Sequence, residues 1–346
     1  MTTKLRRISV AGFPVARFAV PAFAIALLAS ACSSGASDAK PDSAPAAAGS
    51  TVVHVGALSN GAATETDLTV AQQDAIRAEL PASIRDGGTL KVAIGALPAG
   101  FAPLAYVGSD QKTLTGSEPD LARLVAAVLG LKPTFDNATW DNMFVGIDSG
   151  KDAVGFANIT DTEQRKQKYD FATYREDNLG FETLKSSTWS FTGDYNALAG
   201  KTVAVGSGTN QEKILLEWQT KLRAEGKDLS VKYYPDSNST LLALDSGKID
   251  IYLGPNPGVA YQVTQTSKSA NPTRIAGEYS GAGATLQGLI GATAKKDSGL
   301  AKPIADAINY LIQNGDYGKW LASWNLSTEA VQSSQVNPPG LPATNS

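Results

Sequence analysis

The chain has 346 residues, of which 42% are hydrophobic and 18% charged, so it is long enough for more than one packed domain. Its formal net charge is −3 and it contains no block of basic residues, which argues against a nucleic-acid partner. With a single histidine, His54, and a single cysteine, Cys32, it has no Cys–His dyad, Ser–His–Asp triad or His-rich metal site, and no cofactor is expected.

The first 31 residues are typical of an export signal. A basic start precedes an apolar stretch at 18–28, and small residues then lead to Cys32. The apolar stretch is shorter than the ~20 residues of a membrane-spanning helix, and Pro21 interrupts it. We therefore expect a signal peptide over 1–31 and a protein located outside the cytoplasm.

Cys32 follows Ala-Ser-Ala and resembles the lipobox cysteine of bacterial lipoproteins, which is acylated and becomes the mature N-terminus. The match is imperfect, because Leu28 lies four residues before the cysteine instead of three. The resemblance implies that a lipid on Cys32 anchors the protein to the cell membrane. The alternative is an ordinary signal peptide with an incidental cysteine.

Three segments flank the main body of the chain. Residues 32–50 are rich in Ser, Ala, Gly and Pro and predict a flexible tether. Residues 51–87 form a short N-terminal extension, with one helix expected around Val70–Glu79. Residues 329–346, rich in Ser, Gln, Asn and Pro, predict a loose tail.

From Thr89 onward, short β-branched runs alternate with helical periodicity, which predicts an α/β fold with a largely parallel sheet. The helix in which Glu118 occupies the first turn has an acidic start, as helix N-termini favour. The expected elements are a strand at Leu90–Ile94, helices at Pro119–Leu129 and Trp140–Asp148, and a strand at Asp152–Phe156.

The same plan recurs about 100 residues later. Val203–Gly206 is similar to Val92–Gly95, and Asp245–Lys248, before a strand at Ile249–Leu253, is similar to Asp148–Lys151. These similarities predict two α/β lobes. A cleft between them would bring helix N-termini and strand carboxyl ends together, where ligands commonly bind.

The segment 157–171 contains the most informative chemistry. Thr162 followed by Glu163 predicts a helix start, so free backbone N–H groups would point toward 158–160, with Arg165 about one turn further on. N–H donors beside a guanidinium favour a carboxylate, which arginine binds as a planar fork. A lone helical arginine is more often a solvated surface residue, and this pattern alone leaves both interpretations open.

Ile159 to Arg165 resembles the Ile-Thr-x-Thr-x-x-Arg motif of the family 3 extracytoplasmic solute-binding proteins, the polar amino-acid receptors of ABC importers. The resemblance runs from about Gly88 to Trp324. Further similar motifs are Gly116–Leu121, Val205–Thr209, and Asn314–Tyr317 with Trp320.

The resemblance implies a two-lobed, periplasmic-binding-protein-like (type II) α/β fold. Lobe 1 would comprise 88–183 and 286–328, and lobe 2 would comprise 184–285. A hinge of two crossover strands would lie near Phe181–Lys185 and Gly283–Gln287.

The family's ligand site transfers to this chain through the matching motifs. Arg165 would bind the ligand's carboxylate, assisted by Thr160, and Asn158 would lie at the bottom of the cleft. Aromatic rings usually sandwich the ligand, although Phe101 and Trp140 could equally fill the core. The expected ligand-binding residues are Phe101, Trp140, Asn158, Thr160, Arg165, Ser207, Thr209 and Asn210.

One departure concerns the ligand's amino group. Receptors of α-amino acids in this family usually carry an aspartate where this chain has Pro255, and a second one where it has Gly95. A desolvated ammonium without a counter-charge costs several kcal/mol. Either the ligand lacks a standard α-ammonium, or another carboxylate, from Glu176, Asp177 or Glu118, neutralises it.

The expected function is therefore that of the substrate-binding component of an ABC importer. It would be a monomer that captures a small carboxylate-bearing solute and hands it to the permease subunits, without acting as an enzyme. Two alternatives remain on the same scaffold: a periplasmic dehydratase-like enzyme, and a ligand sensor without transport.

Overall fold

The computed structural model describes residues 49–343. The predicted signal peptide, Cys32 and the tether up to residue 48 lie outside these described residues. Within 49–343, no helix is long and apolar enough to cross a membrane.

The N-terminal extension is a β-hairpin that belongs to the core of lobe 1. Strand β1 (Ser50–Val55) pairs antiparallel with β2 (Thr66–Ala71), and their inward residues join the main hydrophobic cluster of that lobe. The helix expected at Val70–Glu79 is wrong at its start, because Val70 lies in β2 with its side chain buried. Helical structure follows only in α1 (Asp74–Ala78) and α2 (Ala82–Gly87).

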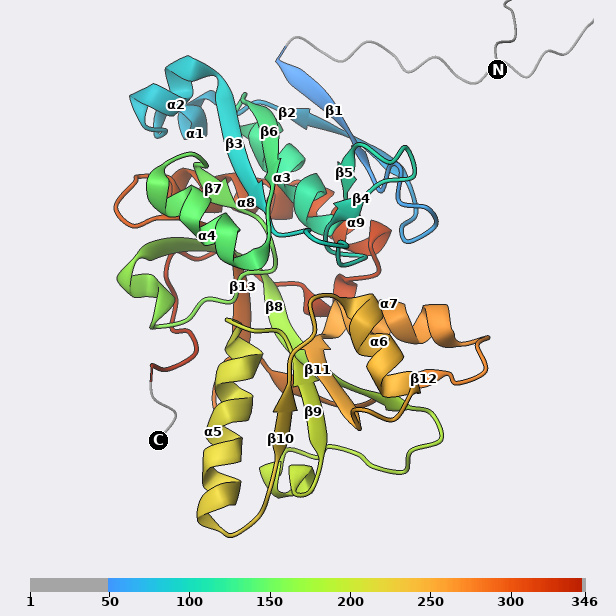
Figure 1. Cartoon of the computed structure of the whole chain (residues 1–346). Helices are drawn as coiled ribbons and strands as arrows, with labels where there is room; N and C mark the ends of the chain where they lie inside the picture. The colour runs from blue at the N-terminus through green and yellow to red at the C-terminus, as the bar shows by residue number, and fades with distance from the viewer. Residues whose placement is uncertain (1–48, 344–346) are drawn as a thin grey trace, which may run out of the picture. The chain divides into compact units, whose positions relative to one another are not determined.

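Helix α3 (Ser117–Val128) is the element of lobe 1 on which this hairpin packs. All of its residues except Arg123 are buried, so it exposes almost no polar face to solvent. The hairpin packs on α3, and residues of β1 and β2 share one core with Leu121 and Leu124. The hairpin thus covers apolar surface of α3 that the sheet of lobe 1 leaves open (Figure 1).

Lobe 1 is built on the sheet order β8-β13-β7-β3-β6, in which β3 pairs parallel with both β6 and β7. Helices α8 and α9 both contribute to its core, and the buried Trp320 lies in α9, with Trp324 directly after it. The remaining elements of this lobe are β3 (Thr89–Ile94), β4 (Tyr106–Val107), β5 (Leu114–Thr115), β6 (Lys132–Asn137), α4 (Trp140–Ser149), β7 (Val154–Gly155), the 3₁₀ helix η1 (Arg165–Gln167), β13 (Gly288–Lys295), α8 (Ala301–Gln313), α9 (Asp316–Ser323) and the 3₁₀ helix η3 (Ser327–Glu329).

Lobe 2 has its own sheet and a separate hydrophobic cluster around Phe181, Trp218 and Leu253. Strand β9 pairs parallel with β10 and with β11. Strand β8 pairs antiparallel with β11 and with β12. Its elements are the 3₁₀ helix η2 (Tyr195–Leu198), β9 (Thr202–Val205), α5 (Asn210–Ala224), β10 (Ser230–Lys232), α6 (Ser237–Asp245), β11 (Ile251–Pro255), α7 (Asn256–Thr266) and β12 (Thr273–Ser280).

One long strand, β8 (Tyr169–Leu184), joins the two lobes (Figure 1). It pairs with β13 up to Asp177 and with β12 and β11 from Asn178 onward. The crossover expected at Phe181–Lys185 therefore lies too late in the chain, since Phe181 already pairs with β11 and packs in the core of lobe 2. The second crossover, at 281–287, is a loop and not a strand.

The C-terminal tail is not loose over the described residues 329–343. In lobe 1 the edge of β8 opposite β13 has no strand partner in the sheet, and the tail covers it: Thr173 N donates to Gln335 O at 3.0 Å, and Asn337 N donates to Phe171 O at 3.1 Å. Leu341 is fully buried, in the cluster of lobe 2. Its polar composition predicts disorder, but backbone pairing with a distant strand overrides that local signal.

Candidate functional site

A cavity of about 560 Å³ lies between the lobes, within the range of small-molecule sites. Its lining follows the carboxyl ends of β3, β7, β9 and β11 and the N-termini of α3 to α6. The convergence of strand ends and helix starts expected from the sequence is therefore present in the described part of the chain.

Six of the eight predicted ligand-binding residues line this cavity. Thr160 and Arg165 are not among the lining residues. The six are Phe101, Trp140, Asn158, Ser207, Thr209 and Asn210.

Arg165 lies at the rim of the cleft and reaches the opposite lobe. Its Nη1 donates to Thr160 O at 2.9 Å and its Nη2 donates to Gly208 O at 3.3 Å, while its guanidinium lies 5.3 Å from the ring centre of Trp140. Arg165 N donates to Thr162 Oγ1 at 3.1 Å, but the helix expected to start at Thr162 is only the short 3₁₀ helix η1, whose N-cap residue is Gln164. Burial lowers the pKa of Arg165 to about 10, because its environment only partly replaces the lost water.

Thr160 and Asn210 converge on the carboxylate of Asp177, at the point where β8 crosses between lobes. Thr160 Oγ1 and Asn210 Nδ2 donate to Asp177 Oδ2 at 2.7 and 3.0 Å. Asn210 Nδ2 also lies 3.0 Å from Gly281 O on the second crossover. Burial raises the pKa of Asp177, and this side chain does not line the cavity. Its contacts tie the crossovers together.

The two aromatic residues each contact the facing lobe. Trp140 Nε1 donates to Gly208 O at 3.2 Å, and its ring meets Phe144 edge-on at 5.2 Å. The Phe101 ring packs so closely on α7 that a Cβ added at Gly258 would lie 2.0 Å from it. Both rings therefore line the cavity and also bridge the lobes.

The loop before α5 presents a helix N-terminus to the cavity. Thr209 caps the helix by accepting from Glu212 N at 3.2 Å, and Glu212 Oε2 accepts from the N–H of Gly208, the residue before the cap, at 2.6 Å. Gly208 has a φ of +73°, a conformation that glycine adopts without strain. The unpaired N–H groups at the start of this 15-residue helix favour an anion.

The charged side chains that line the cavity are all acidic: Glu118, Asp141 and Asp236. No lysine or arginine is among the lining residues within 49–343. Glu118 is fully buried in the first turn of α3, and Asp236 caps α6 by accepting from Ser239 N at 2.8 Å. Of the three carboxylates considered for a ligand ammonium, only Glu118 reaches the cavity; Glu176 and Asp177 do not.

Sequence reasoning did not identify Asp236, Asp141 or Tyr252 as lining residues. Asp236 had a usable signal, because Asp-Ser-Asn-Ser before an apolar run predicts a capped helix start, and helix starts meet at this cleft. Tyr252 carries no such signal, since its place in β11 depends on the sheet register.

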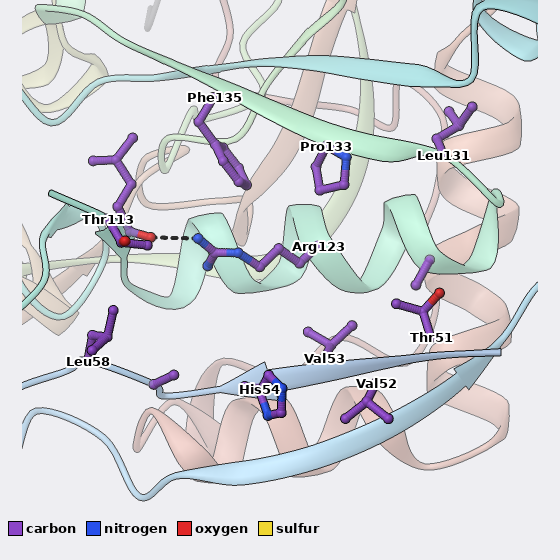
Figure 2. Close-up of a pocket in the computed structure, with 13 residues that line it drawn as sticks. Thr51, Val52, Val53, His54, Leu58, Thr113, Arg123, Leu131, Pro133 and Phe135 are labelled. Atoms are coloured by element: carbon purple, nitrogen blue, oxygen red, sulfur yellow. Dashed lines mark hydrogen bonds between the residues drawn. The ribbon is translucent and has the colours of Figure 1, made fainter. Parts of the chain in front are cut away.

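A second cavity, of about 380 Å³, lies beneath the N-terminal hairpin between β1, α3 and β6 (Figure 2). Its wall is mostly apolar, and its one cationic side chain among the described residues, Arg123, is already engaged. Arg123 donates to Asp120 Oδ1 at 2.7 Å and to Leu114 O at 2.6 Å, and lies over the ring of Phe135.

Comparison with known proteins agrees with the motifs and the fold. The profile of the bacterial extracellular solute-binding proteins, family 3, matches residues 93–327. The L-cystine-binding protein TcyJ of Escherichia coli (strain K12) is 29% identical over 241 residues, which cover 70% of this chain and 84% of that protein. The arginine-binding protein ArgT of Corynebacterium glutamicum is 25% identical over 264 residues, covering 76% and 82%.

Among solved structures, an ancestral arginine-binding protein bound to arginine is 27% identical, with a TM-score of 0.59, and the match covers 68% of this chain and 98% of that one. The two-lobed α/β fold expected from the sequence is thus confirmed, as is the resemblance on which it was based. The chain belongs to family 3 of the bacterial extracellular solute-binding proteins.

Proposed function

We propose that this chain is the substrate-binding component of an ABC importer and that it captures an amino acid, or a close derivative, outside the membrane. The observation that carries the proposal is the cavity shared by the two lobes, whose wall combines a helix N-terminus, two aromatic rings and a buried carboxylate. Relatives named as cystine- and arginine-binding proteins support the same class of ligand.

The ligand's carboxylate binds at the start of α5, next to Arg165. Arg165 Nη2 donates to Gly208 O across a long distance of 3.3 Å. A carboxylate is a stronger acceptor than a peptide carbonyl and presents two oxygens to the guanidinium fork. It therefore replaces Gly208 O as the partner of Arg165. The backbone N–H groups of Ser207, Thr209 and Asn210 complete its hydrogen bonds, since Gly208 N already donates to Glu212 Oε2.

Closure of the lobes around the ligand uses the two crossovers as a hinge. Asp177 O accepts from Gly281 N at 2.8 Å, so the crossovers are already held together at the level of Asp177. Across the rim, Trp140 Nε1 donates to Gly208 O at 3.2 Å. This contact between the lobes forms only when they approach, and the closed surface is what the permease recognises.

The chain is located outside the membrane and is held there by a lipid. Cleavage before Cys32 and acylation of its thiol anchor a monomer to the outer side of the cell membrane, beside the permease subunits. Residues 33–48 then serve as the tether between the lipid and β1.

The protein binds its ligand without converting it. Two of the three carboxylates that line the cavity are held in structural hydrogen bonds: Glu118 accepts from Asn158 N at 3.1 Å, and Asp236 caps α6. A dehydratase-like enzyme on this scaffold requires one of them to exchange protons with the ligand.

Native mass spectrometry of the protein purified from its own cells tests the function, followed by chromatographic identification of the released ligand. We expect a bound amino acid or derivative that is returned unchanged after incubation with many equivalents of ligand. Conversion over many turnovers would establish the enzyme. Unimpaired uptake of that ligand by cells lacking the protein would leave the sensor as the better account.

A further inference from the structure

One buried arginine is shared by two carboxylates directly behind the cavity wall. Arg175 on β8 is 1% exposed, and it forms ion pairs with Glu118 of α3 and Glu329 of the C-terminal segment. Glu329 lies just beyond the region matched by the family profile, which ends at residue 327. The pairing therefore brings a residue outside that region into contact with the site.

Arg175 lies closer to Glu329 than to Glu118. Its Nη1 makes a close contact with Glu329 Oε2, whereas its Nη2 contacts Asn158 Oδ1 and lies farther, at 3.3 Å, from Glu118 Oε1. One guanidinium cannot neutralise two ionised carboxylates, and its closer ion pair is with Glu329. A carboxylate at Glu118 therefore has the longer of the two ion pairs with Arg175, in a fully buried position.

The hydrogen bonds of Glu118 leave room for one more donor. Its Oε2 accepts from Asn158 N at 3.1 Å and from the Tyr174 hydroxyl, and its Oε1 accepts only from Arg175. Two carboxylate oxygens accept about four hydrogen bonds in all. Glu118 is among the residues that line the cavity, but its side chain is fully buried, so a ligand takes the remaining position by displacing the neighbouring side chain of Asn158, which lines the same cavity.

We propose that Glu118 receives the cationic amino group of the ligand, and that Glu329 is a positioning residue that keeps Glu118 available by drawing Arg175 to itself. This inference rests on the proposed function and specifies its ligand class, a carboxylate that also carries a cation. It provides the counter-charge that Pro255 cannot supply where relatives carry an aspartate.

The raised pKa of Glu329 predicts that ligand binding at Glu118 depends on pH. Burial raises the pKa of Glu329 to about 7, against the opposing effect of Arg175, and the carboxylates of Asp177 and Glu118 also act on it. The hydroxyl of Tyr317, on α9, is the other titratable group near Glu329. A cation that binds at Glu118 favours the ionised form of Glu329, so binding releases a proton near neutral pH. Affinity then rises by about tenfold between about pH 6 and pH 8.

Titration calorimetry with three pairs of probes tests the inference. Each pair is an amino acid and the same molecule without its α-amino group: L-cystine and 3,3′-dithiodipropionate, L-arginine and 5-guanidinopentanoate, L-glutamine and glutaramate. We expect the wild-type protein to prefer the amino member of at least one pair by about 100-fold or more, and E118Q to reduce this preference below about tenfold.

The variant E329Q separates positioning from simple packing, because it retains the shape of the side chain. We expect weaker binding of the amino acid and an affinity that no longer changes between pH 6 and pH 8, with E329D restoring part of both. Burial also raises the pKa of Glu182 to about 7, but this residue does not line the cavity. E182Q is therefore the matched control and should retain the wild-type pH profile.

Three results would overturn the inference while leaving the proposed function intact: equal binding of both members of each pair, an unchanged preference in E118Q, or an unchanged pH profile in E329Q. The wild-type pH profile needs no variant, so a folding defect in E118Q does not remove the test. Failure of the wild-type protein to bind any of the six probes would overturn the proposed function as well.

Discussion

Truncation of Arg165 to alanine should abolish most of the affinity for a carboxylate ligand. The guanidinium is half-buried between Thr160, Trp140 and Gly208, and its charge is desolvated enough that its pKa falls to about 10. Removing one partner of such a buried pair leaves the ligand's carboxylate uncompensated, at a cost of about 3–5 kcal/mol. The expected loss is about 100- to 5,000-fold in Kd, measured by titration calorimetry.

Folding should change little in the same variant. Arg165→Ala loses the bond to Thr160 O but also relieves the desolvation of a charge, so the free energy of unfolding should shift by no more than about 1 kcal/mol. Arg223→Ala, at an exposed position near the end of α5, is the matched control and should bind normally. Arg165→Lys should recover only part of the affinity, because an ammonium lacks the planar fork. Full affinity in Arg165→Ala would refute the assignment of the carboxylate site.

Three further predictions test other parts of the molecule. Gly208→Ala should weaken binding by about 1–2 kcal/mol, because a side chain at φ +73° is strained and its Cβ would lie 3.3 Å from Trp140 Nε1; Gly226→Ala, at φ +74° with nothing within 4 Å, should leave calorimetric affinity unchanged. Leu341→Ala should lower the free energy of unfolding in denaturant by about 2–4 kcal/mol, whereas a loose tail would predict no change. Cys32→Ala should move the protein from the membrane to the soluble fraction of fractionated cells, and unchanged partitioning would argue against the lipid anchor.

Local patterns are sufficient to predict the two-lobed fold. The run around Val92 and its counterpart around Val203 both form buried parallel strands, and the helix expected at Trp140–Asp148 is present as α4. Such patterns depend on residues close in sequence, because each helix or strand already shows its period and its start.

Features that depend on distant pairing are not predictable in this way. Val70 has neighbours of helical character, but it forms a strand because it pairs with Thr51. Glu329 appears in a polar tail, and only the folded chain brings it to Arg175, 154 residues earlier in the sequence. The same limit applies to the site: motif matching identifies Arg165 and Trp140, whereas the choice of Glu118 over Glu176 and Asp177 requires the cavity itself.

A crystal structure of the protein with a bound amino acid tests the central claim most directly. We predict a single ligand in the cavity between the lobes, with its carboxylate against Arg165 and the start of α5 and its amino group within hydrogen-bonding distance of Glu118. A ligand seated instead in the cavity beneath the N-terminal hairpin, or one whose carboxylate faces Glu118 while its amino group faces Arg165, would contradict the account.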